Sequence, residues 1–356
     1  MREEHDAPLA DLTTMRVGGP AARLVTVTTT DELVDAVREV DDADEPLLVV
    51  SGGSNLVVAD DGFAGTVVRV ATSGISVESA DQCGGAMVRV AAGEVWDDVV
   101  ARAVDEGWAG IEALSGIPGC AGATPLQNVG AYGQEVARTI AQVRVWDRTE
   151  QRVRTFANAD CAFTYRHSLF KDSSRFVVLD VVFQLRLATV SEPVGYTALA
   201  RGLGVEEGER VPLADARAAV LEQRRARGMV LDAADHDTWS CGSFFTNPVL
   251  SQARYAALKD RAQTRLGAEA VPPEFPAPEG QVKTSAAWLI DQAGFGKGHG
   301  LPGPAALSTK HTLALTNRGE AKADDVVALA REVRDGVFDA FGVVLVNEPV
   351  LVGLSL

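Results

Sequence analysis

A short aromatic segment, Gly242–Pro248, contains the residue whose surroundings most suggest chemistry. Ser243 stands there between a glycine and two phenylalanines, in a stretch too bulky to be a flexible linker. A serine in a dry pocket can deliver a proton to a carbon that develops negative charge. No Gly-x-Ser-x-Gly turn surrounds it and no His-Asp partners are evident, which argues against a hydrolase triad. Ser243 is therefore a candidate proton donor.

Two further residues could stabilise negative charge in such a reaction. Arg166 precedes a predicted strand, Phe176–Leu187, and a guanidinium there could polarise a carboxylate or steady an enolate. Glu348 follows the predicted strand Val343–Val346 and is a candidate acid. For either residue taken alone, an exposed surface side chain is the commoner alternative.

Glycine-rich segments indicate where a phosphate or a flat ring could approach the backbone. Residues 51–55 (Ser-Gly-Gly-Ser-Asn) directly follow the predicted strand Leu47–Val50, so their N–H groups can converge on an anion. A plain tight turn explains these residues equally well. Residues 116–125 and 127–133 form a longer stretch, and ordering so many glycines is costly unless the loop is used. Apolar residues interleaved in it argue against a disordered linker.

Composition sets limits on the class of protein. The chain has 356 residues, 46% hydrophobic and 23% charged, which predicts a normal core and two or three domains. A net charge of −16 argues against nucleic acid or an anionic membrane surface as the main partner. The four cysteines are scattered without a Cys-x-x-Cys pair, so no metal site is expected and a cytoplasmic location fits. There is no apolar run of signal-peptide or membrane-span length.

Hydrophobic periodicity predicts mixed helices and strands, with breaks near Thr72 and Pro212. The predicted strands are Arg23–Val27, Leu47–Val50, Thr66–Val70, Met87–Ala91, Gln142–Trp146, Phe176–Leu187 and Val343–Val346. The predicted helices are Asp31–Val40, Glu94–Glu106, Asp215–Arg227, Thr284–Ala293 and Asp324–Phe341.

Six motifs in order resemble those of the UDP-N-acetylenolpyruvoylglucosamine reductase family of FAD enzymes. They are Arg16–Ala21, Gly53–Leu56, Gly116–Gly119 with Gln127–Gly133, Tyr165–Phe170, Gly242–Pro248 and Lys283–Asp291. The resemblance covers nearly the whole chain, and six motifs with sensible spacing are highly specific. It departs from the family pattern at Cys120 and Ala121, and around Glu348, which is placed by counting back from Gly353.

The resemblance implies an α+β fold in three parts. Two are FAD-binding subdomains of the vanillyl-alcohol-oxidase type, residues 1–71 (with 344–356 returning to it) and 72–212. The third, residues 213–343, is a substrate-binding domain.

The resemblance also implies a reaction. NADPH reduces FAD, and flavin N5 passes hydride to C3 of UDP-N-acetylglucosamine enolpyruvate, giving UDP-N-acetylmuramate for peptidoglycan synthesis. By motif position, Ser243 protonates C2, while Arg166 and Glu348 stabilise the enolic intermediate. NADPH and this sugar nucleotide are then the expected partners of a monomer, with no nucleic acid and no membrane.

Motif position assigns the remaining site residues. Those implied to bind FAD are Arg16, Gly18, Gly19, Ser51, Gly52, Gly53, Ser54, Asn55, Leu56, Ser115, Gly116, Ile117, Pro118, Gly119, Gly122, Ala123, Gln127, Asn128, Gly130, Ala131, Tyr132 and Gly133. Those implied to bind substrate are Tyr165, Tyr196, Arg224, Arg227, Asn247, Gln292 and His299. Arg227 stands where the family often has lysine, so the diphosphate could be held by it or by Arg224.

Two other functions use the same flavin segments. An oxidase of the wider FAD-binding group would not need the Ser243 motif or the Lys283–Asp291 segment. A flavin-binding sensor or storage protein would carry a cofactor that NADPH does not bleach. A set of serine, arginine and glutamate in one site speaks against such a pure binder.

Overall fold

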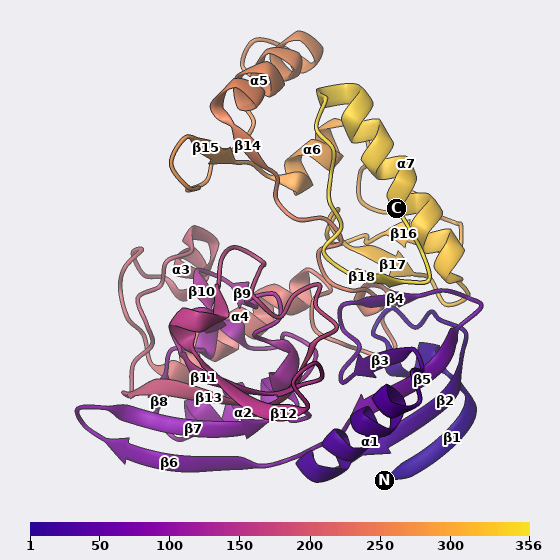
Figure 1. Ribbon diagram of the computed structural model, residues 1–356. Helices are drawn as coiled ribbons and strands as arrows, with labels where there is room; N and C mark the ends of the chain where they lie inside the picture. The colour runs from indigo at the N-terminus through magenta and orange to yellow at the C-terminus, as the bar shows by residue number, and fades with distance from the viewer. The chain divides into compact units, whose positions relative to one another are not determined.

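The computed structural model describes residues 1–356 and divides into two compact units (Figure 1). The first comprises residues 1–7, 21–53 and 64–226, and the second residues 8–20, 54–63 and 227–356. Each unit has its own hydrophobic core. No helix combines the length and the apolar character needed to cross a membrane.

The first unit begins with a four-stranded sheet in the order β1-β2-β5-β3. Helix α1 (Thr30–Asp42) buries Leu33, Val37 and Val40, and the Thr29 side chain caps its first turn by accepting a hydrogen bond from the N–H of Glu32. Strands β3 and β5 pair in parallel. Residues 51–53 directly follow the C-terminal end of β3. The strands are β1 (Arg2–Pro8), β2 (Pro20–Val27), β3 (Leu47–Val50) and β5 (Phe63–Val70).

A second, antiparallel sheet follows in the order β12-β11-β13-β7-β6, with β8 also paired to β13. The central strand β13 (Phe176–Leu187) is buried over most of its length and supplies a large share of the core. Helix α2 (Trp96–Asp105) packs Trp96, Val99 and Val100 into the same core. The other strands are β6 (Ile75–Asp81), β7 (Gly85–Ala91), β8 (Trp108–Ala109), β11 (Ile140–Asp147) and β12 (Arg152–Ala157).

Two helices of the first unit form a satellite with a small core of its own. Helices α3 (Thr197–Leu203) and α4 (Leu213–Ala226) enclose Val194, Leu199 and Val220, and Ala113 of the preceding loop joins them. This satellite carries Tyr196 and Arg224, so its attachment to the loops at 110–135 decides where those side chains lie.

The second unit is built from short strand pairs and helices. In Figure 1, α7 (Ala323–Phe341) lies beside β16 and β17, and it buries Val326, Ala330, Val333, Val337 and Phe341. Strand β18 pairs in parallel with β4, so the end of the chain lies against residues 56–58. The other elements are β4 (Leu56–Val58), β14 (Val249–Ser251), α5 (Gln252–Leu266), β15 (Gln281–Lys283), α6 (Ala286–Gln292), β16 (Ala305–Leu307), β17 (Leu315–Asn317) and β18 (Val350–Val352).

The predicted α+β class is confirmed, and the structure has strands at Leu47–Val50 and Phe176–Leu187 as expected. The predicted last strand at Val343–Val346 is wrong. That stretch alternates buried and exposed side chains as a strand would. It forms no continuous strand pairing, however, and makes isolated backbone hydrogen bonds such as the one from the Thr246 N–H to the Val346 carbonyl. The final strand is β18, where Val350–Val352 pair in parallel with Leu56–Val58 of β4.

Candidate active site

Ser243 and Glu348 are carried by two adjacent backbone segments of the second unit. The Glu348 N–H donates to the Phe244 carbonyl at 2.8 Å, and Phe245 bridges Asn347 in antiparallel fashion. Phe244 and Phe245 are both 1% exposed and pack edge to face, which fixes the segment between Gly242 and Thr246. Ser243, which is half-buried, therefore lies on a fixed segment beside the one that carries Glu348.

Glu348 is also tied to the predicted phosphate turn. The Asn55 side-chain amide donates to the Glu348 carbonyl at 3.2 Å, and the Val350 N–H donates to the Asn55 carbonyl at 2.9 Å. Burial, with a contribution from the Glu348 carboxylate, raises the pKa of Cys241 to about 12. The Cys241 thiol donates to the Leu56 carbonyl at 3.4 Å, so Asn55, Leu56, Cys241 and Glu348, which lie far apart in the sequence, form one cluster.

Arg166 belongs to the first unit, where it closes a second predicted loop. Its guanidinium donates to the Gly130 carbonyl at 2.8 Å and lies 5.3 Å from the centre of the Tyr165 ring. Asn128 donates to the Thr164 carbonyl at 3.0 Å, and Ser168 donates to the Leu126 carbonyl at 2.6 Å. The 126–135 loop and the 164–170 segment are therefore joined by hydrogen bonds from the side chains of Asn128, Arg166 and Ser168.

The glycine loops of the first unit approach each other backbone to backbone. A Cβ built on Gly52 would lie 2.5 Å from the Gly119 Cα, and one built on Gly122 would lie 2.5 Å from the Ala92 Cβ. Burial raises the pKa of the Cys120 thiol, although Ser51 and Gly52 hydrogen-bond to it. Because Gly52 and Gly119 bring no side chain to the junction, a diphosphate or a flat ring can approach their peptide groups closely. The loops fit FAD on this ground.

The Gly116 end of this loop is held by a carboxylate. Asp97 of α2 accepts the Gly116 N–H at 2.6 Å and a bidentate pair from Arg217 of α4 at 2.6 and 2.9 Å. Burial works to raise the pKa of Asp97, but the hydrogen bonds from Arg217 and Gly116 outweigh it and leave the pKa below the ordinary 3.8. The satellite helix α4 is thereby anchored to the loop.

The N-terminal motif, Arg16–Ala21, lies mostly in the second unit. A Cβ on Gly19 would stand 2.0 Å from the Asp60 carbonyl oxygen, so only glycine fits there. The Arg16 guanidinium lies 3.9 Å from the centre of the Trp239 ring, and Asn317 donates to the Arg16 carbonyl at 3.1 Å. The close approach alone accounts for the glycine at position 19.

The substrate-side candidates are divided between the two units. In the first, Tyr196 meets Tyr132 edge to face at 5.3 Å. In the second, Asn247 accepts the Ala286 N–H at the start of α6, and Gln292 at its end donates to Asp291. His299 lies 2.8 Å from a Glu332 oxygen.

Arg227 has two neighbours that the sequence did not indicate. Burial, followed by the charges of Arg227 and Lys297, lowers the pKa of His311 to about 4. The imidazole is therefore neutral near pH 7, beside two cations. Neither Lys297 nor His311 belongs to a recognisable motif, so only the fold reveals this cluster, which suits an anionic group.

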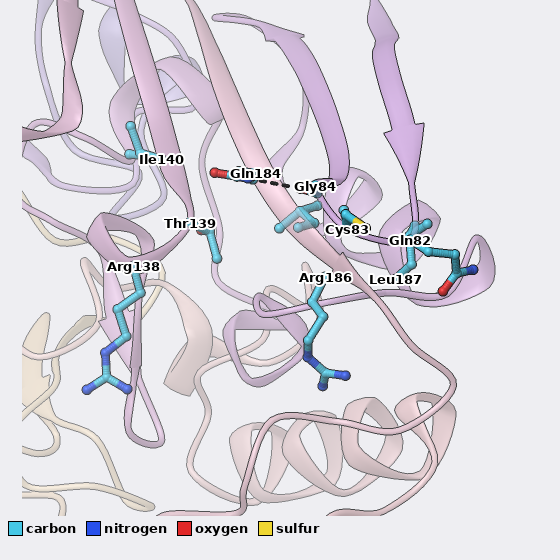
Figure 2. Close-up of a pocket in the computed structure, with 11 residues that line it drawn as sticks. Gln82, Cys83, Gly84, Arg138, Thr139, Ile140, Gln184, Arg186 and Leu187 are labelled. Carbon is cyan, nitrogen blue, oxygen red and sulfur yellow. Dashed lines mark hydrogen bonds between the residues drawn. The ribbon is translucent and has the colours of Figure 1, made fainter.

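A cavity of about 340 Å³ lies elsewhere in the first unit (Figure 2). The β6–β7 turn, residues 138–140 and the end of β13 line it, and none of the predicted site residues does. Figure 2 shows Arg138 and Arg186 extending away from the strands. Arg186 is engaged by Glu192 at 2.8 Å.

Comparison with known proteins identifies the family. A model of the FAD binding domain matches residues 21–155, and one described as "UDP-N-acetylenolpyruvoylglucosamine reductase, C-terminal domain" matches residues 233–352. The UDP-N-acetylenolpyruvoylglucosamine reductase of Streptomyces avermitilis is 61% identical over 100% of this chain and 96% of its own length. The chain belongs to this reductase family. The UDP-N-acetylenolpyruvoylglucosamine reductase of Thermobifida fusca is 57% identical over 99% of this chain and 98% of its own length.

A solved structure agrees with this assignment. The reductase from Thermus caldophilus shares 26% identity with a TM-score of 0.66, covering 99% of both chains. Membership of the reductase family, with its FAD-binding domain, makes the chain an FAD-dependent oxidoreductase.

The reductase fold predicts that the Gly52 junction is essential for holding FAD. In Gly52→Ala the new methyl meets Gly119 Cα at 2.5 Å, and relieving such overpacking costs about 1–3 kcal/mol. We expect the FAD dissociation constant to rise roughly 10- to 100-fold. Fluorescence titration of deflavinated protein measures it. Gly296→Ala, with open space around the new methyl, is the control. Equal FAD affinity in the two variants would contradict the assignment.

The Asp97–Arg217 pair predicts a pH-dependent contribution to stability. Arg217→Gln should lower the free energy of unfolding at pH 7 by about 1 kcal/mol, since Asp97 is 33% exposed and partly screened. A carboxyl group whose pKa is lower in the folded state than in the unfolded state stabilises the fold at a pH above its unfolded-state pKa. This stabilisation is lost as the pH falls through the folded-state pKa. In urea unfolding, the difference in free energy of unfolding between the variant and the wild type should therefore shrink below about pH 3.8. Arg225→Gln, on the exposed side of α4, should show no such convergence.

Proposed function

We propose that the chain reduces UDP-N-acetylglucosamine enolpyruvate to UDP-N-acetylmuramate with NADPH as the hydride donor, in peptidoglycan precursor synthesis. The relatives' printed name supplies the substrate class. Bound FAD supplies hydride chemistry that no side chain can perform. The three-part division at residues 71, 212 and 343 stays part of this proposal.

One observation carries the proposal: the segment of Ser243 is hydrogen-bonded to the segment of Glu348 through Phe244. An acid and a hydroxyl donor so fixed suit a reaction that adds hydride to one carbon and a proton to its neighbour. In this proposal Ser243 delivers the proton to C2. Glu348 and Arg166 stabilise the negative charge that grows toward the substrate carboxylate.

The cationic cluster supports an anionic substrate. Arg227, Lys297 and the neutral His311 lie together in a chain whose net charge is −16. We propose that this cluster binds the diphosphate of the sugar nucleotide, with Arg224 as the alternative holder. Tyr196, Tyr165, Asn247, Gln292 and His299 are the further proposed substrate contacts.

Product analysis tests the proposed function. The holoenzyme is incubated with NADPH and UDP-N-acetylglucosamine enolpyruvate, and the products are separated by chromatography with mass detection. We expect a product two hydrogen atoms heavier than the substrate, formed in step with NADPH oxidation. NADPH oxidation at the same rate without the enolpyruvyl compound would instead indicate an oxidase that uses oxygen.

A further inference from the structure

A buried carboxylate that no motif includes lies between the two tyrosine-bearing segments of the first unit. Glu112, in the turn after β8, is 1% exposed. One of its oxygens accepts the Gly110 N–H at 2.7 Å. The other accepts both the Gln134 side-chain amide at 2.9 Å and the Glu192 N–H at 2.6 Å. A buried charge is tolerated only when hydrogen-bonded in this way.

The two donors on the shared oxygen come from different parts of the site. Gln134 ends the 127–133 glycine loop, which carries Tyr132, and its side chain also accepts the Ala113 N–H at 2.8 Å. Glu192 begins the segment that leads to Tyr196. The two segments then meet at the edge-to-face contact of Tyr132 and Tyr196, 5.3 Å between ring centres. A single carboxylate oxygen thus joins the bases of both.

We propose that Glu112 is a positioning residue that sets Tyr196 against Tyr132 and thereby sets the affinity for the sugar-nucleotide substrate. The inference rests on the proposed function, because it takes Tyr196 to be a substrate contact. The satellite core around Val194 and Leu199 holds the helices in place, but no apolar contact can fix the Glu192 peptide as a hydrogen bond does. Tyr196 is 40% exposed, and its contact with Tyr132 requires the backbones of the two segments to be held at the right separation.

A double-mutant cycle with Glu112→Met and Tyr196→Ala tests the proposal. Methionine is close in size to glutamate but has no carboxylate oxygen, so the Gln134 amide, the Glu192 N–H and the Gly110 N–H all lose their acceptor. We expect the KM for the enolpyruvyl substrate to rise about 10-fold, with the KM for NADPH and the FAD content unchanged. In the Tyr196→Ala background the same change should alter the substrate KM by less than about twofold, because coupled residues are not additive. Glu207→Met, the same replacement at an exposed glutamate of the satellite, is the control.

The outcomes separate the inference from the proposed function. A wild type that never uses the enolpyruvyl substrate overturns both. Two outcomes overturn the inference alone, provided that the wild type turns over the enolpyruvyl substrate. In one, the effects of the two substitutions on the substrate KM multiply; in the other, Tyr196→Ala leaves that KM unchanged. If Glu112→Met does not fold, Gln134→Met removes one of the three donors, together with the acceptor of the Ala113 N–H, and leaves the carboxylate. It should raise the substrate KM about threefold in the wild-type background and not in Tyr196→Ala.

Discussion

Replacing Ser243 with alanine should leave the reduction of bound FAD by NADPH nearly unchanged and slow its reoxidation by the enolpyruvyl substrate about 10²- to 10⁴-fold. The hydroxyl is the proposed proton donor, and only the second half-reaction transfers that proton to carbon. The buried rings of Phe244 and Phe245 hold the segment in either variant, so the loss reflects chemistry rather than folding. Anaerobic stopped-flow absorbance measures the two half-reactions separately.

Thr246→Val provides a matched control for this experiment. It removes a hydroxyl from the same segment, where the Thr246 side chain makes a long 3.3 Å bond to the Val346 carbonyl. We expect both rates to stay close to those of the wild type. If Ser243→Ala slowed both half-reactions equally, Ser243 would not be a specific proton donor.

The second large effect is expected at Glu348. In Glu348→Gln the side chain keeps its size, and its backbone N–H still donates to the Phe244 carbonyl. The acid that steadies developing charge on the substrate is lost, which should slow the second half-reaction about 10²- to 10³-fold. Single-turnover reoxidation of reduced enzyme measures this loss, with flavin reduction by NADPH as the internal reference.

Glu320→Gln is the control for this charge change, because Glu320 is an exposed glutamate of the same unit. It should leave both half-reactions unaltered. Reoxidation in Glu348→Gln as fast as in Glu320→Gln would remove Glu348 from the proposed chemistry, whatever its backbone does.

The elements with strong local patterns were predictable from the sequence. The spacing of apolar residues in α7 predicts a helix, and the continuous valine-rich run of β13 predicts a buried strand. The last strand was not predictable, because two valine-rich stretches compete near the C-terminus. The choice between Val343–Val346 and Val350–Val352 depends on β4, which lies far away in the sequence.

The site was predictable only where residues form motifs. Ser243 and Glu348 were identified singly, but the hydrogen bond through Phe244 that links their segments is a tertiary contact. Glu112 and His311 belong to no sequence motif. Glu112 accepts the N–H of the distant Glu192, and His311 lies near Arg227 and Lys297, so only the fold shows these neighbours. Likewise, the contact that requires glycine at Gly19 comes from Asp60.

The most direct test of the account is an anaerobic absorbance titration of the purified holoenzyme. NADPH is added first, and UDP-N-acetylglucosamine enolpyruvate follows. The account predicts that NADPH bleaches the visible flavin band and that the enolpyruvyl compound restores it in equal amount. Bleaching without recovery would contradict the proposed substrate, and a flavin band that NADPH leaves intact would contradict the proposed hydride donor.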